Sequence, residues 1–226
     1  MGRHLALLGS INVGGNRITM ADLVGALTRH GFADVETVVA SGNILFDPPT
    51  GVLGKELPDR IADIVRSELG VDTFALVLSA AELEAAIAEN PFSGTGEDKF
   101  VHVHFLTAQP GPERFERLLA DHAGRGDERI APGTRALHID YVNGVGTSKL
   151  TAAFIERRLG CQGTARNMRS LKRLTERLAC WPATTPLPNS NRSASSRWAS
   201  GSAISCPNCS RAARRMTTCF PPATSR

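Results

Sequence analysis

The stretch GSINVGGN, residues 9–16, holds the residue types most suited to binding an anion. Gly14 and Gly15 permit positive φ angles and let the backbone approach a ligand closely. A helix predicted to begin just after this stretch would leave N–H groups unpaired and a partial positive charge at its first turn, which favours phosphate or carboxylate. The alternative is a plain strand-to-helix connection, in which Asn12 and Asn16 hydrogen-bond the turn.

A second stretch of the same kind is NGVGTSKL, residues 143–150. Thr147 or Ser148 is predicted to cap a helix, which places Lys149 in the first helical turn. A cation there opposes the helix dipole by a few tenths of a kcal/mol, and a bound anion would relieve the mismatch. Exposed lysines without any ligand are equally common at such positions, so both interpretations stay open.

The third candidate is Arg166-Asn167, at the start of a predicted final helix. A guanidinium can bind a phosphate or carboxylate through two parallel hydrogen bonds. The outward face of this helix, residues 167–179, is basic, and such a face more often contacts only solvent.

Other reactive residue types form no catalytic pattern. His102 and His104 lie two apart on a predicted strand and share one face, but no third ligand is spaced to join them. No nucleophile has an activating base at a recognisable spacing, so catalytic residues stay unknown. We predict no metal site and no cofactor.

The positive charge of the chain belongs to its C-terminal segment. The 226 residues carry a formal net charge of +4, yet residues 180–226 contain six arginines and no lysine or acid. Residues 1–179 are therefore mildly acidic, and the charge is no evidence that they bind nucleic acid. Four of the five cysteines also lie in that segment. One remaining thiol, without a secretory signal or a long apolar run, predicts a cytoplasmic protein with no membrane contact.

Alternating strand and helix patterns predict an α+β fold. The elements expected in the first 90 residues are a strand at 4–8, a helix between Thr19 and Gly31, strands at 35–40 and 43–46, a helix at 58–69, a strand at 73–78 and a helix from Ser79 to Asn90. Those expected next are strands at 99–106, 128–131 and 134–142, helices at 112–120 and 148–159, a short strand near Cys161 and the final helix at 167–179. This order predicts two ferredoxin-like βαββαβ halves with antiparallel sheets, at residues 1–90 and 98–179, the second including the final helix.

The segment at residues 180–226 has no strand or helix periodicity. It is rich in Ser, Arg, Pro, Thr and Ala and lacks acidic residues. Such a composition buries too little apolar surface to offset the entropy of ordering, which predicts a disordered tail. Its unusual composition is also what an out-of-frame translation after a frameshift would produce.

Six motifs in order resemble a known family. They are LLGSINVGGNRITM, VASGNILF, NPF, VHVHFL, NGVGTSKLT and GTARNMRSLKRLTERLA. Over about residues 3–179 the chain resembles the bacterial domain-of-unknown-function family 1697. The resemblance implies an α+β protein of ferredoxin-like halves in a bacterial cytoplasm, and no activity. The family pattern usually has Arg-Gly where this chain has Gly9-Ser10, and Trp-Asn where it has Met168-Arg169.

These patterns together predict a cytoplasmic protein that binds a phosphorylated or otherwise anionic ligand, such as a nucleotide or nucleic acid. The predicted ligand-binding residues are Asn12, Gly14, Gly15, Asn16, Ser148, Lys149, Arg166 and Asn167. Whether the three stretches meet depends on how the two halves pack. The alternative function is a non-catalytic protein–protein interaction domain, whose protein partners the sequence does not name.

Overall fold

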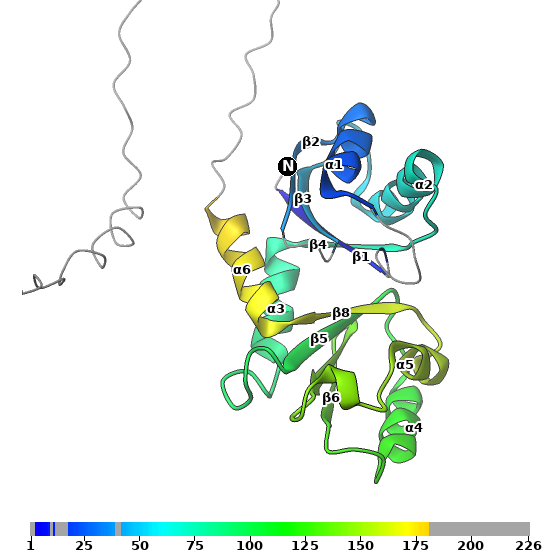
Figure 1. Cartoon of the computed structure of the whole chain (residues 1–226), viewed down its shortest axis with the longest axis vertical. Helices are drawn as coiled ribbons and strands as arrows, with labels where there is room; N and C mark the ends of the chain where they lie inside the picture. The colour runs from blue at the N-terminus through cyan, green and yellow to red at the C-terminus, as the bar shows by residue number, and fades with distance from the viewer. Residues whose placement is uncertain (1–2, 10, 12–17, 39–41, 181–226) are drawn as a thin grey trace, which may run out of the picture. The chain divides into compact units, whose positions relative to one another are not determined.

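The computed structural model describes residues 3–9, 11, 18–38 and 42–180 (Figure 1). Four predicted ligand-binding residues, Asn12, Gly14, Gly15 and Asn16, lie outside the described residues, as does the predicted tail from residue 181 onward.

Each half of the chain forms one antiparallel four-stranded sheet. The first half contains β1 (His4–Leu8), α1 (Met20–Arg29), β2 (Ala33–Thr37), β3 (Asn43–Asp47), the 3₁₀ turn η1 (Gly54–Glu56), α2 (Leu57–Leu69), β4 (Ala75–Ser79) and α3 (Ala80–Glu89). The second half contains β5 (Val101–Leu106), α4 (Pro112–His122), β6 (Arg129–Gly133), β7 (Ala136–Asp140), the 3₁₀ turn η2 (Val145–Thr147), α5 (Ala152–Leu159), β8 (Gly163–Asn167) and α6 (Met168–Ala179). The strand orders are β2-β3-β1-β4 and β6-β7-β5-β8. The predicted α+β fold of two βαββαβ halves is confirmed.

The helices begin and end where their capping residues require. The Thr19 hydroxyl accepts a hydrogen bond from the Asp22 N–H at the start of α1, at 3.1 Å. Ser79 and Glu82 bond each other's backbone N–H groups at the start of α3, which is a complete capping box. Gly70 ends α2 with a φ angle of 67°, a conformation that glycine adopts without steric cost.

The predicted start of α5 is wrong. The helix begins at Ala152 and its cap is Thr151, whose hydroxyl accepts a hydrogen bond from the Phe154 N–H at 3.2 Å. Ser148 cannot cap it, because its hydroxyl bonds the Glu128 carboxylate and the Leu150 N–H. The lysine at position 149 therefore lies before the helix and not in its first turn. The argument that an anion would relieve a dipole mismatch there no longer applies.

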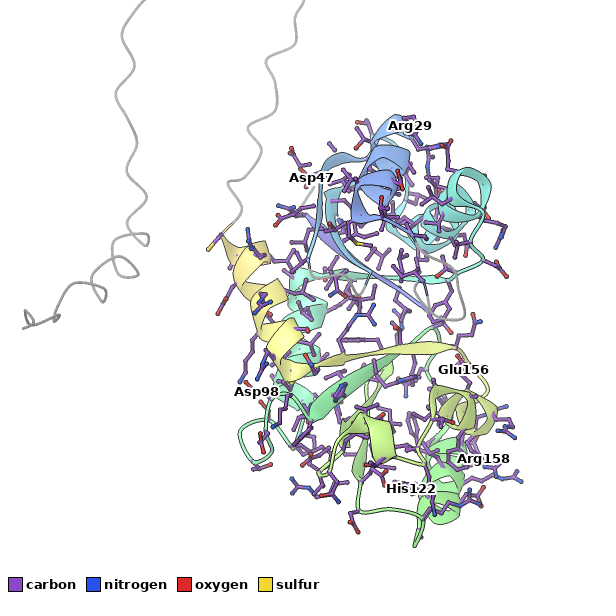
Figure 2. All side chains as sticks on the ribbon, in the orientation of Figure 1. Arg29, Asp47, Asp98, His122, Glu156 and Arg158 are labelled. Atoms are coloured by element: carbon purple, nitrogen blue, oxygen red, sulfur yellow. The ribbon has the colours of Figure 1, made fainter. Side chains whose placement is uncertain are left out.

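The inner faces of the two sheets share one core. Leu5 and Leu7 of β1, Leu76 of β4 and Val103 and Phe105 of β5 belong to a single buried cluster, which α3 and α6 complete. The opposite face of the first sheet packs against α1 and α2, and the opposite face of the second sheet packs against α4 and α5 (Figures 1 and 2). The described residues of the two halves belong to one compact unit.

Among the residues that the structure describes, no helix is both long and apolar enough to span a membrane.

Candidate functional site

The backbone at the start of the opening glycine stretch is held from both sides. Leu8 donates its N–H to the carbonyl of Gly42, next to β3, at 2.9 Å. Gly9 donates its N–H to the carbonyl of Phe74, next to β4, at 3.0 Å. The Thr73 hydroxyl donates to the Gly9 carbonyl at 2.5 Å. Gly9, the first residue of the predicted anion-binding stretch, and Leu8 before it therefore have a defined position between two strands.

Arg166 contacts the same point from the second half of the chain. Its Nη2 donates to the Leu8 carbonyl at 2.9 Å, and its Nε donates to Asn43 Oδ1 at 2.6 Å. Its Nη1 donates to the Thr164 hydroxyl at 2.7 Å and to the Ala165 carbonyl at 2.9 Å. Burial lowers the pKa of the guanidinium to about 10, which leaves it charged at neutral pH.

Arg166 was predicted to bind a ligand directly, and its geometry indicates a different contribution. The residue is only 7% exposed, and all three guanidinium nitrogens donate hydrogen bonds within the protein. Its contacts tie β8 to the ends of β1 and β3. The residue thus positions the start of the opening stretch relative to the second half.

A cavity of about 700 Å³ lies next to Gly9. One wall comes from α2, which contributes Asp59 and Arg66, and the floor follows β4 from Phe74 to Val77. The opposite wall comes from the second half and includes Arg135 and Glu156. This volume lies within the range of about 300 to 1,000 Å³ that is typical of small-molecule sites.

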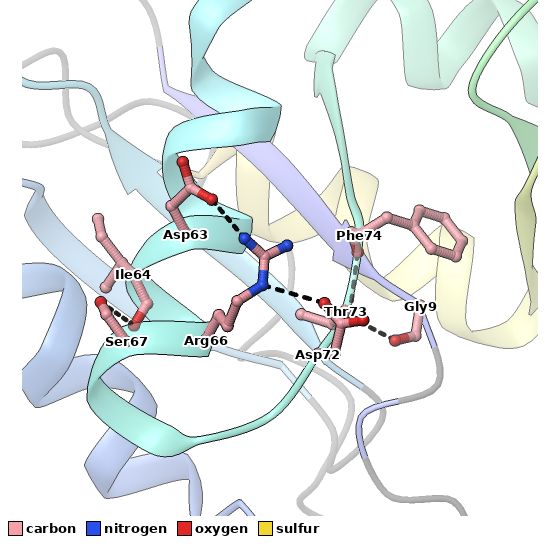
Figure 3. Close-up of polar contacts among 8 residues, drawn as sticks. All are labelled: Gly9, Asp63, Ile64, Arg66, Ser67, Asp72, Thr73 and Phe74. Atoms are coloured by element: carbon pink, nitrogen blue, oxygen red, sulfur yellow. Dashed lines mark hydrogen bonds and ion pairs between the residues drawn. The ribbon is translucent and has the colours of Figure 1, made fainter.

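Arg66 is the cation with the best-defined position in this cavity. Its Nε donates to Asp72 Oδ1 at 3.1 Å and its Nη1 donates to Asp63 Oδ1 at 2.8 Å, as Figure 3 shows. The hydrogen bond to Asp72 is the main cause that raises the pKa of the guanidinium. Gly9, Thr73 and Asp72 lie together beside it (Figure 3). The two carboxylates contact this side chain at the surface beside the cavity, where the Arg66, Asp63 and Asp72 side chains are 55%, 70% and 87% exposed.

The other charged groups of the cavity have mixed signs. Arg135 lies on the turn between β6 and β7, and its φ angle of 49° is unusual for a residue with a side chain. No ion pair to its guanidinium occurs within the described part of the chain. Asp59 and Glu156 supply carboxylate oxygens. Such a lining suits a ligand that combines an anionic group with hydroxyl or amino groups.

Phe74 covers the position where the family pattern has an arginine. A Cβ atom at Gly9 would overlap the Phe74 ring, so the space beside residue 9 is already filled in this protein. The cations of the cavity thus come from α2, which carries Arg66, and from the β6–β7 turn, which carries Arg135. No residue spacing or motif in the sequence indicated these two arginines as site residues.

The second glycine-containing stretch lines a different and smaller cavity. Lys149 borders a space of about 240 Å³ together with Arg125 and Tyr141. Burial raises the pKa of the Tyr141 hydroxyl to about 12. The structure therefore places Arg166 next to the start of the opening stretch. Lys149 lines a different cavity from the one next to Gly9. A direct ligand role for Ser148 and Lys149 stays a prediction.

Ser148 belongs to a buried polar group beside this smaller cavity. Its hydroxyl donates to Glu128, whose other carboxylate oxygen lies 3.2 Å from His122 Nε2. The carboxylate lies between the hydroxyl and the imidazole, whereas nucleophile activation requires the imidazole next to the hydroxyl. No sequence spacing indicated this group.

Asn167 serves as the cap of α6. Its side chain accepts a hydrogen bond from the Ser170 N–H at 2.9 Å. On the basic face of the same helix, Lys172 pairs with Asp98 at 2.6 Å. Arg177 pairs with Glu36 at 3.3 Å.

The two strand histidines lie on the face of the second sheet that α4 and α5 cover. Burial, together with the charge of Arg166, lowers the pKa of His104 to about 4. Burial also lowers the pKa of His102, whose Nδ1 lies 2.9 Å from the Phe100 carbonyl. Over the described ranges, no three His, Cys, Asp or Glu side chains lie close enough to hold a metal ion together.

Comparisons with known proteins point to a family and to a fold. The family described as Protein of unknown function (DUF1697) matches residues 1–138. The solved structure of the conserved bacterial protein SP0830 from Streptococcus pneumoniae is similar over 78% of this chain and 98% of that chain, with 21% sequence identity and a TM-score of 0.58. A search of curated proteins found no match.

Proposed function

Because the chain belongs to the DUF1697 family, which is described as of unknown function, we propose a function from the geometry of the cavity beside Gly9: it binds a small ligand that carries a phosphate or carboxylate group. The observation that carries the proposal is the position of Arg66. Asp72 and Asp63 orient its guanidinium at the wall of a cavity that begins where the predicted anion-binding stretch begins.

The residues around the cavity would contact different groups of the ligand. Arg66 and Arg135 are the cations that attract the anionic group. Asp59 and Glu156 can accept hydrogen bonds from hydroxyl or amino groups of the ligand. Arg166 acts one step away, because it fixes the backbone of Leu8 at the edge of the site.

The ligand class that fits best is a nucleotide, a sugar phosphate or a similar small phosphorylated molecule. Carboxylates on both walls of the cavity disfavour a ligand whose surface is uniformly anionic. A small molecule with one anionic end matches the mixed charges better than a long nucleic acid does.

Thermal stability in the presence of ligands tests this proposal. Inorganic phosphate, nucleotides and sugar phosphates at millimolar concentration should include a compound that raises the melting temperature, since a ligand at 100 times its Kd stabilises the folded state by about 2.7 kcal/mol. The variant Arg66→Gln should reduce this shift. Arg60→Gln is the matched control, because Arg60 lies on the same helix and donates to His30 instead, at 3.4 Å.

The proposal fails if no compound in the panel stabilises the wild-type protein. It also fails if Arg66→Gln and Arg135→Gln both respond to the ligand as the wild type does. A shift that is lost equally in Arg60→Gln would indicate general charge screening and not a site.

A second candidate function is a protein–protein interaction domain. A groove of about 520 Å³ lies between α4 and β6, and its lining includes Phe115, Leu119 and Pro132. Leu119 is 37% exposed, so this groove presents an apolar side chain to a partner. Light scattering during size-exclusion chromatography separates the two functions: a defined oligomer that ignores every ligand of the panel favours this second one.

The compartment that we propose is the cytoplasm. Within the residues that the structure describes, Cys161 and Cys180 are free thiols, as expected for a chain kept in a reducing environment.

A further inference from the structure

Strand β4 forms one edge of the first sheet, and the direction of its backbone groups follows from its pairing with β1. In an antiparallel ladder, successive residues point their N–H and C=O groups alternately toward one neighbour and toward the other. Gly9 donates to Phe74 across this pair, and Leu7 pairs with Leu76 two residues on. The backbone N–H and C=O groups of Phe74 and Leu76 therefore point toward β1. Those of Ala75 and Val77 point toward the open edge of the sheet.

Two residues of β4 consequently offer free backbone groups. Ala75 and Val77 point their N–H and C=O groups away from β1, and neither residue has a further backbone partner in the described part of the chain. Ser79 has the same orientation, but Glu82 accepts its N–H at 2.8 Å. The Ser79 N–H thus finds its partner away from β1, as the alternation of backbone directions along β4 predicts.

The other three sheet edges carry features that oppose strand addition. Strand β2 has a shift in register between Ala33 and Glu36, and Arg3 occupies the carbonyl of Asp34. Strand β6 contains Pro132, which cannot donate a hydrogen bond. On β8, Arg166 occupies the outward carbonyl of Ala165. Natural sheets protect their edges in such ways, so the plain edge of β4 stands out.

The free edge of β4 faces the cavity described above. Residues 73–77 line it in succession, which places the first three residues of β4 along one side of the space. Arg66 and Asp59 border this edge on the side of α2, and Arg135 and Glu156 border it on the side of the second half. A smaller space of about 110 Å³ continues along Leu76 and Leu78 toward α3, again with Arg135 in its wall. The two spaces together follow β4 from Ala75 to Leu78.

We propose that the edge of β4 binds an extended peptide, which adds to the first sheet as a fifth strand. The N–H and C=O groups of Ala75 and Val77 supply four backbone hydrogen bonds, and alternate side chains of the peptide point to the two walls. The partner is a polar peptide with an acidic group opposite Arg66 and a basic or hydroxyl group opposite Asp59 or Glu156. The assignment of the acidic group rests on the proposed function, whereas strand addition rests on the sheet edge.

A selection from a random heptapeptide library, displayed with its messenger RNA and screened against the full-length protein, supplies the probe. Each enriched peptide is then synthesised with a single N-methyl group at every position in turn. Strand addition predicts that methylation at alternate positions weakens binding about tenfold or more, while the positions between tolerate it, since only every second amide faces β4. An empty selection, from a library that yields binders to a control peptide-binding domain, overturns the inference. A methylation profile without alternation also overturns it.

Two matched variants place the peptide on β4. Ala75→Pro removes an outward N–H that the sheet does not use, so it should weaken peptide binding at least tenfold. Ala165→Pro makes the same change at the outward position of β8 and should leave binding within twofold. Equal loss in both variants, or retained binding in Ala75→Pro, contradicts the assignment. If Ala75→Pro does not melt cooperatively, the methylation profile decides instead, because it uses the unaltered protein.

The two proposals can fail separately. Stabilisation by inorganic phosphate that depends on Arg66, without any peptide binding, overturns strand addition and leaves the proposed function intact. Alternating peptide binding that Arg66→Gln does not alter overturns the acidic-group assignment and leaves strand addition intact, and the proposed function is then decided by the ligand panel alone.

Discussion

Arg166 is the residue that connects the most distant parts of the chain. Its buried guanidinium joins β8 to the end of β1 and to the start of β3, and its hydrogen bonds to the described residues measure 2.6 to 2.9 Å. A buried charge is stable only when its hydrogen-bond donors are satisfied. Replacing Arg166 by an apolar residue would also remove hydrogen bonds from the buried groups that accept them.

Arg166→Met should lower the free energy of unfolding by about 3 kcal/mol, because the buried Leu8 carbonyl and Asn43 Oδ1 would each lose the hydrogen bond that Arg166 donates. Urea unfolding followed by circular dichroism measures the change. Arg169→Met, three residues further on and exposed, should cost less than about 0.5 kcal/mol. Similar losses in the two variants would show that the network does not stabilise the fold.

The low pKa of His104 predicts that the protein loses stability in acid. Its pKa in the folded protein is about 4, against 6.5 as the ordinary value, so the unfolded chain takes up the proton first as the pH falls. The stabilisation is complete above pH 6.5 and is lost between pH 6.5 and about 4, by roughly 3 kcal/mol from this residue.

Unfolding in urea at several pH values tests this prediction with His104→Gln. The variant should show a smaller drop than the wild type between pH 6.5 and 4, and the two curves should run parallel between pH 7.5 and 8.5. A drop of the same size in both proteins would assign the acid sensitivity to other groups, such as His102 and His138, whose pKa values burial also lowers.

At the scale of elements, the short segment before α5 shows how a tertiary contact moves a helix boundary. The sequence TSKLT offers three hydroxyl residues that could cap the helix. Ser148 bonds Glu128, and the helix begins after Thr151 instead. The contact of Ser148 with Glu128 therefore helps to decide that Thr151 caps the helix.

Thr151→Ala should reduce stability by about 1 kcal/mol, which is the usual effect of losing a helix cap. Thr147→Ala should cost clearly less, because the Thr147 hydroxyl bonds the nearby Gly144 carbonyl, at 3.3 Å, and does not cap the helix. Thermal unfolding of both single variants measures the difference. The reverse order of the two effects would restore Thr147 as the cap.

At the scale of the whole molecule, the two halves share the core between their sheets. Leu7 of the first half and Phe105 of the second belong to the same buried cluster. A shared core of this kind couples the stabilities of the parts that build it.

Leu7→Ala and Phe105→Ala should each lower stability by roughly 3 kcal/mol and should do so in both halves. Native-state hydrogen exchange reads the two halves separately, through amides of β3 and β7. Leu53→Ala, at a side chain that is 56% exposed, serves as the control and should change neither half. A loss confined to the half that carries the substitution would mean that the halves unfold independently.

The sequence by itself determined the order of the elements and most of their boundaries. Local patterns suffice for this, because the capping box at Ser79 and the left-handed Gly70 act within a few residues of the chain. The same local signals predict the duplication of the βαββαβ unit, which the sheet topology confirms.

Only the tertiary structure decided how these elements form a site. Arg66 and Arg135 are far apart in the sequence and line one cavity because the two sheets pack through their inner faces. The same packing places Lys149 at a different cavity and turns Arg166 inward. Contacts between distant residues depend on the burial of both sheets, and no local pattern contains that information.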